Sequence, residues 1–176
     1  MSPILITDIN KFSDRRGEFY ESYKSSHLAK YGIDVTFVQD NQSSSRFGTV
    51  RGLHYQWDKP IGKLVRVSKW AIKDVVVNID SNSAEFGRVY SFYLSDSNLN
   101  QLWVPPHYAH GFVALADDTT VHYKCSSEYN KNGESGINPL CPFLNIDWVV
   151  DANLHILSDK DKAAQSFEDY KKNPKF

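Results

Sequence analysis

The chain has 176 residues, of which 41% are hydrophobic and 23% charged, and its formal net charge is −1. This length predicts a single domain over residues 1–176 with a sizeable core, and the composition excludes a disordered chain. A net charge near zero argues against a broad basic surface for nucleic acid. The sequence contains neither the roughly 20 apolar residues of a membrane span nor a signal-peptide pattern at its start. We therefore expect a cytoplasmic protein.

Most of the chain is expected to form short strands between turns. Helices are expected over residues 21–31, before Gly32, and near residues 159–170. Alternating or β-branched runs predict strands at residues 63–67, 74–79, 88–94 and 120–124. Residues 171–176 are expected to fray. Many short strands without a βαβ rhythm are typical of an all-β sandwich or barrel.

One polar group follows the first predicted helix. Gln39 and Asn41 precede the run that contains Arg51 and His54, and Lys63 begins the next predicted strand. Arginine and lysine suit diphosphate oxygens, and histidine suits proton transfer near neutral pH. A histidine alone is more often structural, but its neighbours here favour a functional site.

The segment 101–112 contains two prolines, which restrict it to a sheet edge or a strand entry. His107 and His110 raise the question of a metal site. Metal sites in β-barrels of the cupin kind usually need a His-x-His pair, whereas His54 is followed by Tyr and Gln. We therefore expect no metal. Cys125 and Cys141 form no CxxC pair, so both are expected to be reduced and structural.

Two later residues have both a structural and a functional interpretation. Strand alternation places Tyr123 on the face opposite to His122 and Lys124. Tyr123 is then either a packed core residue or a group that faces a cavity. Asp161 follows a possible helix start, either as an ordinary surface carboxylate or as a partner that orients a histidine. Sequence spacing alone does not show that Asp161 meets His54.

Seven motifs, in this order and spacing, resemble those of the dTDP-4-dehydrorhamnose 3,5-epimerase family. The similarity runs from about residue 8 to residue 162. Each motif is weak by itself, whereas the ordered set is specific. The motifs are Asp14-Arg-Arg-Gly-Glu-Phe-Tyr-Glu21, Phe37-Val-Gln-Asp-Asn41, Arg51-Gly-Leu-His-Tyr-Gln56, Gly62-Lys-Leu-Val-Arg-Val67, Gln101-Leu-Trp-Val-Pro-Pro106, Ala109-His-Gly-Phe112 and Ile156-Leu-Ser-Asp-Lys-Asp161.

The resemblance implies a cupin-type jelly roll, usually a homodimer, with the active site inside the barrel. His54 corresponds to the family's base, Asp161 to its carboxylate partner and Tyr123 to the proton donor on the opposite face. Lys63 and His110 correspond to sugar-site residues, Lys63 holding the developing oxyanion, and Asp74 looks like the partner that orients His110. The resemblance implies no redox cofactor, and the sequence has no GxGxxG loop. The expected nucleotide- and substrate-binding residues are Arg16, Glu21, Gln39, Asn41, Arg51, Glu134 and Lys160, with Arg16 and Glu21 serving the partner subunit's site.

Three features depart from the family pattern. Lys69-Trp70-Ala71 replaces a turn that usually carries glycine, residues 138–142 differ from the usual Trp-Asn-Asp stretch, and the chain ends soon after Asp161. Several alternatives stay open on the sequence. They are an epimerase that acts at one carbon only or on a GDP- or CDP-linked sugar, a 3,4-ketoisomerase, a sugar-nucleotide-binding module without turnover, and a metal-dependent cupin dioxygenase.

Overall fold

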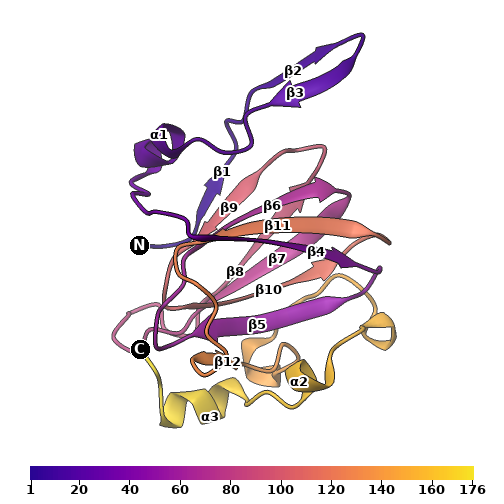
Figure 1. Ribbon diagram of the computed structural model, residues 1–176. Coiled ribbons are helices and arrows are strands. Elements are labelled where there is room, and N and C mark those ends of the chain that lie inside the picture. Colours follow the sequence, from indigo (N-terminus) through magenta and orange to yellow (C-terminus); the bar gives the residue numbers. More distant parts are fainter.

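The computed structural model describes residues 1–176 and contains two five-stranded antiparallel sheets that pack face to face (Figure 1). The first sheet has the order β1 (Ile4–Ile6), β9 (Gln101–Val104), β6 (Lys63–Lys69), β11 (Thr119–Cys125) and β4 (Gln39–Ser45). The second has the order β12 (Glu134–Gly136), β5 (Val50–Gln56), β10 (Tyr108–Ala114), β7 (Ala71–Asn78) and β8 (Val89–Ser95). The all-β, cupin-type jelly roll expected from the sequence is therefore confirmed.

The remaining elements lie outside this sandwich. β2 (Lys11–Asp14) and β3 (Gly17–Tyr20) form a hairpin that projects from one side (Figure 1). α1 (Ser25–Leu28) continues into a 3-10 turn at Ala29–Tyr31. Two further 3-10 turns occupy Pro142–Leu144 and Ala152–Leu154, and the chain ends with α2 (Asp159–Lys162) and α3 (Phe167–Lys172).

The predicted strands are confirmed to within a few residues, whereas the helices are shorter than expected. The helix expected over 21–31 begins at Ser25, and it stops where Gly32 takes a left-handed conformation with φ 73°. The helix expected near 159–170 is two helices, because Ser166 caps a new helix by accepting the backbone N–H of Asp169. No helix in the protein is both long and apolar enough to cross a membrane.

The prediction that residues 171–176 fray was wrong. The ring of Phe176 stacks on His107 with 4.4 Å between centroids and also contacts Tyr55. Its backbone oxygen accepts a hydrogen bond of 3.1 Å from the N–H of Ser81. The polar run Lys171-Lys172-Asn173 suggested a solvated end. The sequence was misleading because Phe176, which follows this run, buries its ring against the core.

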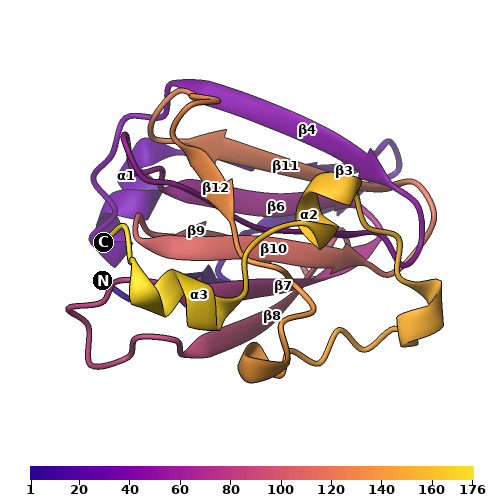
Figure 2. The ribbon, with the colours of Figure 1, turned by 90° about the horizontal axis from the view of Figure 1, so that it is seen from below.

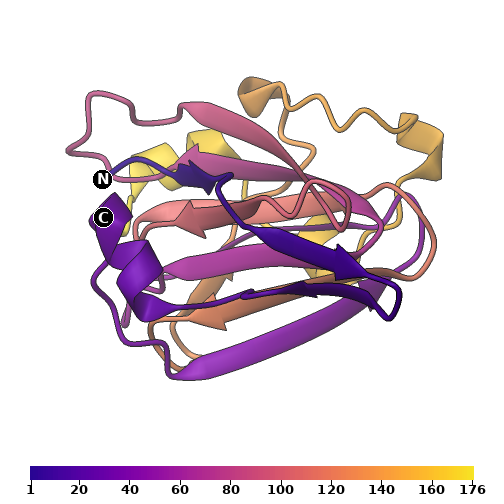
Figure 3. The ribbon, with the colours of Figure 1, turned by 90° about the horizontal axis from the view of Figure 1, so that it is seen from above.

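Three apolar clusters hold these layers together. One lies between the sheets and includes Val65, Leu102 and Phe112. The largest lies on the outer face of the second sheet, where the segment from Ile137 to Phe176 covers it (Figure 2). The third joins the α1 region to the outer face of the first sheet (Figure 3). The second sheet is therefore covered on both faces, which fixes the strands that carry the site.

β5 and β10 approach each other unusually closely in the middle of the second sheet. A Cβ on Gly52 would lie 2.6 Å from the Cα of Gly111, and a Cβ on Gly111 would lie 2.5 Å from the carbonyl oxygen of Arg51. Only glycine fits at such facing positions. The register shifts here, between His110 and Phe112, while His110 and His54 remain directly paired. Two glycines thus place two histidines side by side.

The cysteines and the unusual turn also have clear structural roles. Cys125 and Cys141 are both free and buried, which confirms the expectation of reduced structural thiols.

Trp70 lies in the turn where the resemblance implies a glycine, and it takes the left-handed conformation with φ 65°. Its backbone N–H donates to the carboxylate of Asp96 (2.7 Å), and its carbonyl accepts from the N–H of Asp96 (3.0 Å). These bonds hold the turn without glycine.

Candidate active site

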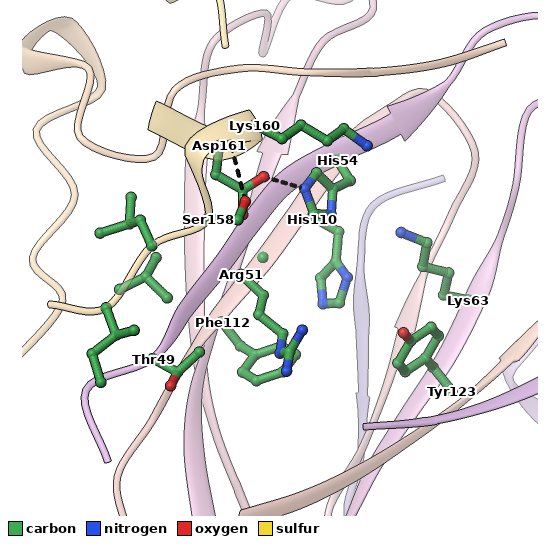
Figure 4. Close-up of a pocket in the computed structure, with 14 residues that line it drawn as sticks. Thr49, Arg51, His54, Lys63, His110, Phe112, Tyr123, Ser158, Lys160 and Asp161 are labelled. Atoms are coloured by element: carbon green, nitrogen blue, oxygen red, sulfur yellow. Dashed lines mark hydrogen bonds and ion pairs between the residues drawn. The ribbon is translucent and has the colours of Figure 1, made fainter. Parts of the chain in front are cut away.

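Two adjoining cavities open between the sheets, with volumes of about 400 Å³ and 460 Å³. His54, Lys63 and Tyr123 line both of them, so these three side chains mark where the cavities meet. Figure 4 shows His54 on one side of the first cavity, with Lys63 and Tyr123 across from it. His54 comes from the second sheet, whereas Lys63 and Tyr123 come from the first.

His54 pairs with Asp161. The Nε2 atom of His54 lies 2.6 Å from a carboxylate oxygen of Asp161, although the two residues are 107 positions apart. The Asp161 side chain is 7% exposed, and that of His54 is 31% exposed. The carboxylate is thus shielded while the imidazole reaches the cavity. Asp161 lies in the first turn of a helix, as the sequence suggested. Its side chain points inward toward the sheet and is not on the surface (Figure 4).

The environment of Asp161 keeps it ionised. Burial opposes its ionisation, but the hydrogen bond and charge of His54, together with hydrogen bonds from Ser158 and the backbone of Gly52, hold its pKa below the ordinary 3.8. An ionised carboxylate at this position stabilises an imidazolium on His54. The pair can therefore accept a proton from a molecule in the cavity.

A second histidine–carboxylate pair lies deeper. The Nε2 atom of His110 lies 2.8 Å from one oxygen of Asp74 and 3.0 Å from the other. Asp74 is fully buried and the His110 side chain is 7% exposed. Burial raises the pKa of Asp74 above the ordinary 3.8, although His110 and Lys63 partly oppose this shift. The pair fixes the ring of His110 against the cavity wall.

Lys63 and Tyr123 project from neighbouring strands of the first sheet. Burial lowers the pKa of the Lys63 amine, and the nearby Cys125, Asp74 and Glu134 oppose that shift. Burial also raises the pKa of Tyr123 above 10.0, so its phenol stays protonated at neutral pH. Strand alternation was predicted correctly, because His122 on the opposite face contacts Ser68 instead (2.8 Å).

The other predicted binding residues divide between the two cavities. Arg51 and Lys160 line the first cavity, and Gln39, Asn41 and Glu134 line the second. The Nε atom of Arg51 donates to the hydroxyl of Ser45 (3.0 Å), which joins β5 to β4. One oxygen of Glu134 accepts from both the Lys160 amine (2.5 Å) and the hydroxyl of Tyr129 (2.8 Å).

The amides form a short chain of hydrogen bonds along the second cavity. The side-chain nitrogen of Gln39 donates to the side-chain oxygen of Asn41 (2.9 Å), and the nitrogen of Asn41 donates to the sulfur of Cys125 (3.6 Å). The side-chain oxygen of Gln39 accepts the backbone N–H of Tyr129 (2.8 Å). These bonds orient amide groups beside an aromatic ring, an arrangement suited to a planar heterocycle.

Arg16 and Glu21 lie outside both cavities of their own chain. Arg16 sits at the turn of the β2–β3 hairpin and pairs with Asp14 (2.6 Å), and Glu21 pairs with Lys24 (3.4 Å). The hairpin projects away from the sandwich (Figure 1). Within one chain, these two residues do not reach the site.

Two candidate site residues were missed by the sequence reasoning. Ser158 lines the first cavity, and its hydroxyl accepts the backbone N–H of Asp161 (3.1 Å). The spacing of a serine three residues before an acidic residue, a helix-start pattern, could have revealed it. Ser43 has a buried hydroxyl without a hydrogen-bond partner, on the same face of β4 as Asn41. No sequence signal distinguishes it from its two serine neighbours.

His107 and His110 do not converge on one point. The Nδ1 atom of His107 lies 3.7 Å from Asp80, whereas His110 contacts Asp74. The structure contains no group of three or more His, Cys, Asp or Glu side chains suited to hold a metal ion. The expectation of a metal-independent site remains a prediction.

Comparison with known proteins agrees with this geometry. The family model described as dTDP-4-dehydrorhamnose 3,5-epimerase matches residues 1–169. An enzyme of that name from Shigella flexneri is 42% identical over 168 residues, covering 94% of this chain and 92% of the relative. The crystal structure of a dTDP-6-deoxy-D-glucose-3,5-epimerase from Legionella pneumophila, in complex with dTDP-4-keto-L-rhamnose, superposes with a TM-score of 0.90 at 39% identity, covering 94% of this chain and 88% of the other.

A more distant solved structure is a 3'-monoepimerase from Streptomyces bikiniensis in complex with dTDP-quinovose. It has a TM-score of 0.91 and 28% identity, covering 97% of this chain and 86% of that one.

The fold, the paired histidines in the cavity and these similarities define an isomerase of the carbohydrate epimerase class. More particularly, the chain belongs to the dTDP-4-dehydrorhamnose 3,5-epimerase family.

Proposed function

We propose that this protein inverts carbons 3 and 5 of dTDP-4-dehydro-6-deoxyglucose to give dTDP-4-dehydrorhamnose. The observation that carries the proposal is the placement of His54 and Tyr123 on opposite sides of one cavity (Figure 4). Identity is higher to enzymes named 3,5-epimerases than to the monoepimerase, 42% against 28%, which favours inversion at both carbons over one. The whole chain, residues 1–176, acts as one epimerase domain.

The chemistry requires three kinds of group. A C–H bond beside a ketone is acidic because the resulting carbanion delocalises onto the ketone oxygen as an enolate. In a 4-keto sugar, carbons 3 and 5 both flank the ketone. Inversion therefore needs a base on one face, a donor for the enolate oxygen, and an acid that returns a proton to the opposite face.

His54 is the proposed base. Its neutral imidazole takes the proton from the carbon, and the resulting imidazolium is stabilised by the ionised Asp161 at 2.6 Å. The side-chain exposure of His54, 31%, is consistent with access to a substrate. One histidine and one tyrosine can serve both carbons in turn if, between the two steps, His54 releases its proton to solvent and Tyr123 regains one from solvent.

Lys63 and His110 are the proposed donors to the enolate oxygen. Both line the first cavity, and both are held in shielded positions where a donor to a developing charge is most effective. Asp74 fixes the ring of His110 and is a positioning residue. These groups need no rearrangement when the negative charge develops on the oxygen.

Tyr123 is the proposed acid. A buried phenol whose pKa lies above 10.0 keeps its proton at neutral pH and can donate it to a carbanion. Since Tyr123 reaches the cavity from the first sheet and His54 from the second, the proton arrives on the face opposite to the one that lost it. Configuration at that carbon is then inverted.

The nucleotide portion occupies the polar rim in this proposal. Arg51 and Lys160 bear the charges that suit diphosphate oxygens, and the amides of Gln39 and Asn41 with the ring of Tyr129 suit the base. Glu134 holds Lys160 and Tyr129 at this rim.

We further propose a cytoplasmic homodimer in which Arg16 and Glu21 complete the neighbouring subunit's site. Phe12 and Phe19 are directly paired in the projecting hairpin, and each is about two-thirds exposed, 66% and 67%. A two-stranded ribbon is marginally stable alone, and exposed aromatic residues favour contact with another surface. A second copy of the chain supplies such a surface. Two reduced thiols are consistent with the cytoplasm.

Incubation with dTDP-4-dehydro-6-deoxyglucose in D2O tests the reaction. We expect deuterium at carbons 3 and 5 by NMR and mass spectrometry, with product of the rhamno configuration. Deuterium at one carbon alone would instead support the single-centre epimerase. Tight binding without any exchange would support a non-catalytic sugar-nucleotide-binding module.

Mixing two inactive variants tests the exchange of Arg16 between subunits. His54→Ala lacks the base, and Arg16→Ala lacks the donated cation. If Arg16 serves the partner's site, mixed dimers regain activity, because the His54→Ala chain supplies Arg16 to the intact base of the other chain. If Arg16 serves its own site, no mixture recovers activity. Light scattering that gives a fully active 20.1 kDa monomer would refute the dimer.

A further inference from the structure

The carboxylate of Asp161 is held by an element that cannot be stable alone. α2 has four residues, Asp159–Lys162, and isolated helices of this length do not form in water. Its position therefore depends on contacts with the rest of the protein. Ile156 lies just before this helix. Its backbone oxygen accepts from the N–H of Val50 at the start of β5 (2.9 Å), and its N–H donates to the carbonyl of Gly48, which precedes β5 (3.0 Å). These bonds fix the approach to α2 but do not reach Asp161.

The hydroxyl of Ser158 supplies the missing constraint. It accepts the backbone N–H of Asp161 (3.1 Å), and the carbonyl oxygen of Ser158 accepts the N–H of Lys162 (3.1 Å). The serine takes the extended conformation of a helix N-cap. The Ser158 hydroxyl also helps to lower the pKa of Asp161, alongside His54 and against the effect of burial. One hydroxyl thus holds the backbone of Asp161 and favours the ionised form of its carboxylate.

We propose that Ser158 is a positioning residue for proton abstraction: its hydroxyl fixes Asp161, and through Asp161 it fixes the imidazole of His54. This inference rests on the proposed function, because it requires His54 to act as the base. Proton abstraction is sensitive to the position of the base within fractions of an ångström. Loss of the Ser158 hydroxyl leaves the backbone N–H of Asp161 without its capping acceptor, so the direction of the carboxylate toward His54 is less constrained.

The other titratable and charged groups around the cavity remain unchanged when Ser158 is replaced. They come from every element that faces Asp161 and His54, and their effect on the pKa of Asp161 is therefore the same in the wild type and in the variants. These groups are Arg51 on β5, Lys63 on β6, Asp74 on β7, His110 on β10, Tyr123 on β11, Glu134 on β12 and Lys160 on α2.

The chain offers a matched control in the next helix. Ser166 caps α3, and its hydroxyl accepts the backbone N–H of Asp169 (3.0 Å), as Ser158 does for Asp161. Ser166 lines neither cavity. Ser166→Ala therefore removes the same kind of helix cap without touching the site.

Four variants, Ser158→Ala, Ser158→Thr, Ser158→Asp and Ser166→Ala, test the inference in the full chain. For Ser158→Ala we expect kcat for dTDP-4-dehydro-6-deoxyglucose to fall on the order of 10-fold, the size of one hydrogen bond, with KM little changed. The pKa of Asp161, followed by carboxyl-carbon NMR, should rise. Ser158→Thr keeps the hydroxyl, so its kcat and the pKa of its Asp161 should be close to those of the wild type. Ser166→Ala should also leave both quantities unchanged.

Ser158→Asp keeps the inference testable if Ser158→Ala does not fold. Aspartate retains an acceptor for the helix cap but cannot donate to Asp161 when ionised. We expect a folded variant with lowered kcat and a raised pKa of Asp161.

Normal kcat in Ser158→Ala or Ser158→Asp would overturn the inference, as would equal losses of kcat in Ser158→Ala and Ser166→Ala. The proposed function fails separately, if the wild-type protein shows no deuterium exchange. The NMR titration of Asp161 tests its contact with Ser158 in either case.

Discussion

The histidines of two histidine–carboxylate pairs line one cavity, yet the surroundings of the two pairs differ. In the His54–Asp161 pair the histidine side chain is 31% exposed, and in the His110–Asp74 pair it is 7% exposed. The pKa of Asp161 lies below its ordinary value, whereas burial raises that of Asp74. The comparison shows that two pairs of the same residue types differ in burial, which leaves the imidazole of His54 accessible from the cavity and shields that of His110.

The two pairs also differ in how the chain builds them. His110 and Asp74 lie on adjacent strands, β10 and β7, whose backbone bonds fix their spacing. His54 and Asp161 join β5 to a short helix near the end of the chain. The first pair is part of a rigid sheet, and the second depends on the packing of the C-terminal segment. Perturbation of that segment should therefore affect His54, the proposed base, more than His110, a proposed donor to the enolate oxygen.

Removal of each imidazole in turn gives the largest expected contrast. His54→Ala should lower turnover at least about 10²-fold and abolish deuterium exchange at both carbons, because no base remains. His110→Ala should cost less, because Lys63 still holds the enolate oxygen. Exchange is measured by NMR in D2O. His122→Ala, which alters the outward face of β11, is the control and should be normal. Near-normal exchange in His54→Ala would overturn the assignment of the base.

Tyr123→Phe should block the second half of the reaction. The variant loses only a hydroxyl, so the fold and proton abstraction by His54 survive, and net epimerisation should fall about 10²-fold. Deuterium should still enter the substrate with retained configuration. Tyr170→Phe is the matched control, since it loses a buried hydroxyl that donates to Ile79 (2.8 Å) and should cost stability alone. If Tyr123→Phe epimerises normally, Tyr129 or a water becomes the next candidate.

Replacement of Asp161 and of Asp74 by asparagine should affect the two pairs differently, both in turnover and in the pH dependence of stability. Asp161→Asn should lower kcat about 10- to 100-fold, whereas Asp74→Asn should cost a few-fold, because it changes the orientation of a donor and not the strength of the base.

The contributions of Asp161 and Asp74 to the free energy of unfolding should change in opposite directions as pH rises. The folded pKa of Asp161 lies below 3.8, so its stabilisation is present above pH 3.8 and is lost as pH falls toward the folded pKa. The folded pKa of Asp74 lies above 3.8, so its contribution declines as pH rises from 3.8 through the folded value. Urea unfolding of both variants between acid and neutral pH measures this difference. Identical pH dependence would contradict the distinction between the pairs.

The smallest expected effect concerns metal ions. Because neither pair is joined by a third ligand, chelation should leave turnover unchanged, and elemental analysis of the purified protein should find no stoichiometric iron or zinc. Loss of activity in chelator, with recovery on adding one metal, would favour the metal-dependent alternative.

The sequence by itself determined the strands and most candidate residues. Alternation in 120–124 correctly separated Tyr123 from His122, because side chains on a strand point to alternate faces whatever the fold. The ordered motifs correctly indicated the family and the cupin-type fold. These features are local, or they are carried by residue identity, and so they can be recognised before folding.

Only the tertiary structure decided which residues meet. It placed the Asp161 carboxylate 2.6 Å from His54, a pairing that the family resemblance implied and that sequence spacing alone did not show. It also revealed Ser158 beside them and packed Phe176 against the core, where the polar C-terminal run had predicted a frayed end. It also left Arg16 outside the cavity of its own chain. The physical reason is that contacts between distant segments depend on how whole layers pack, and packing is a property of the assembled surfaces rather than of any one stretch of sequence.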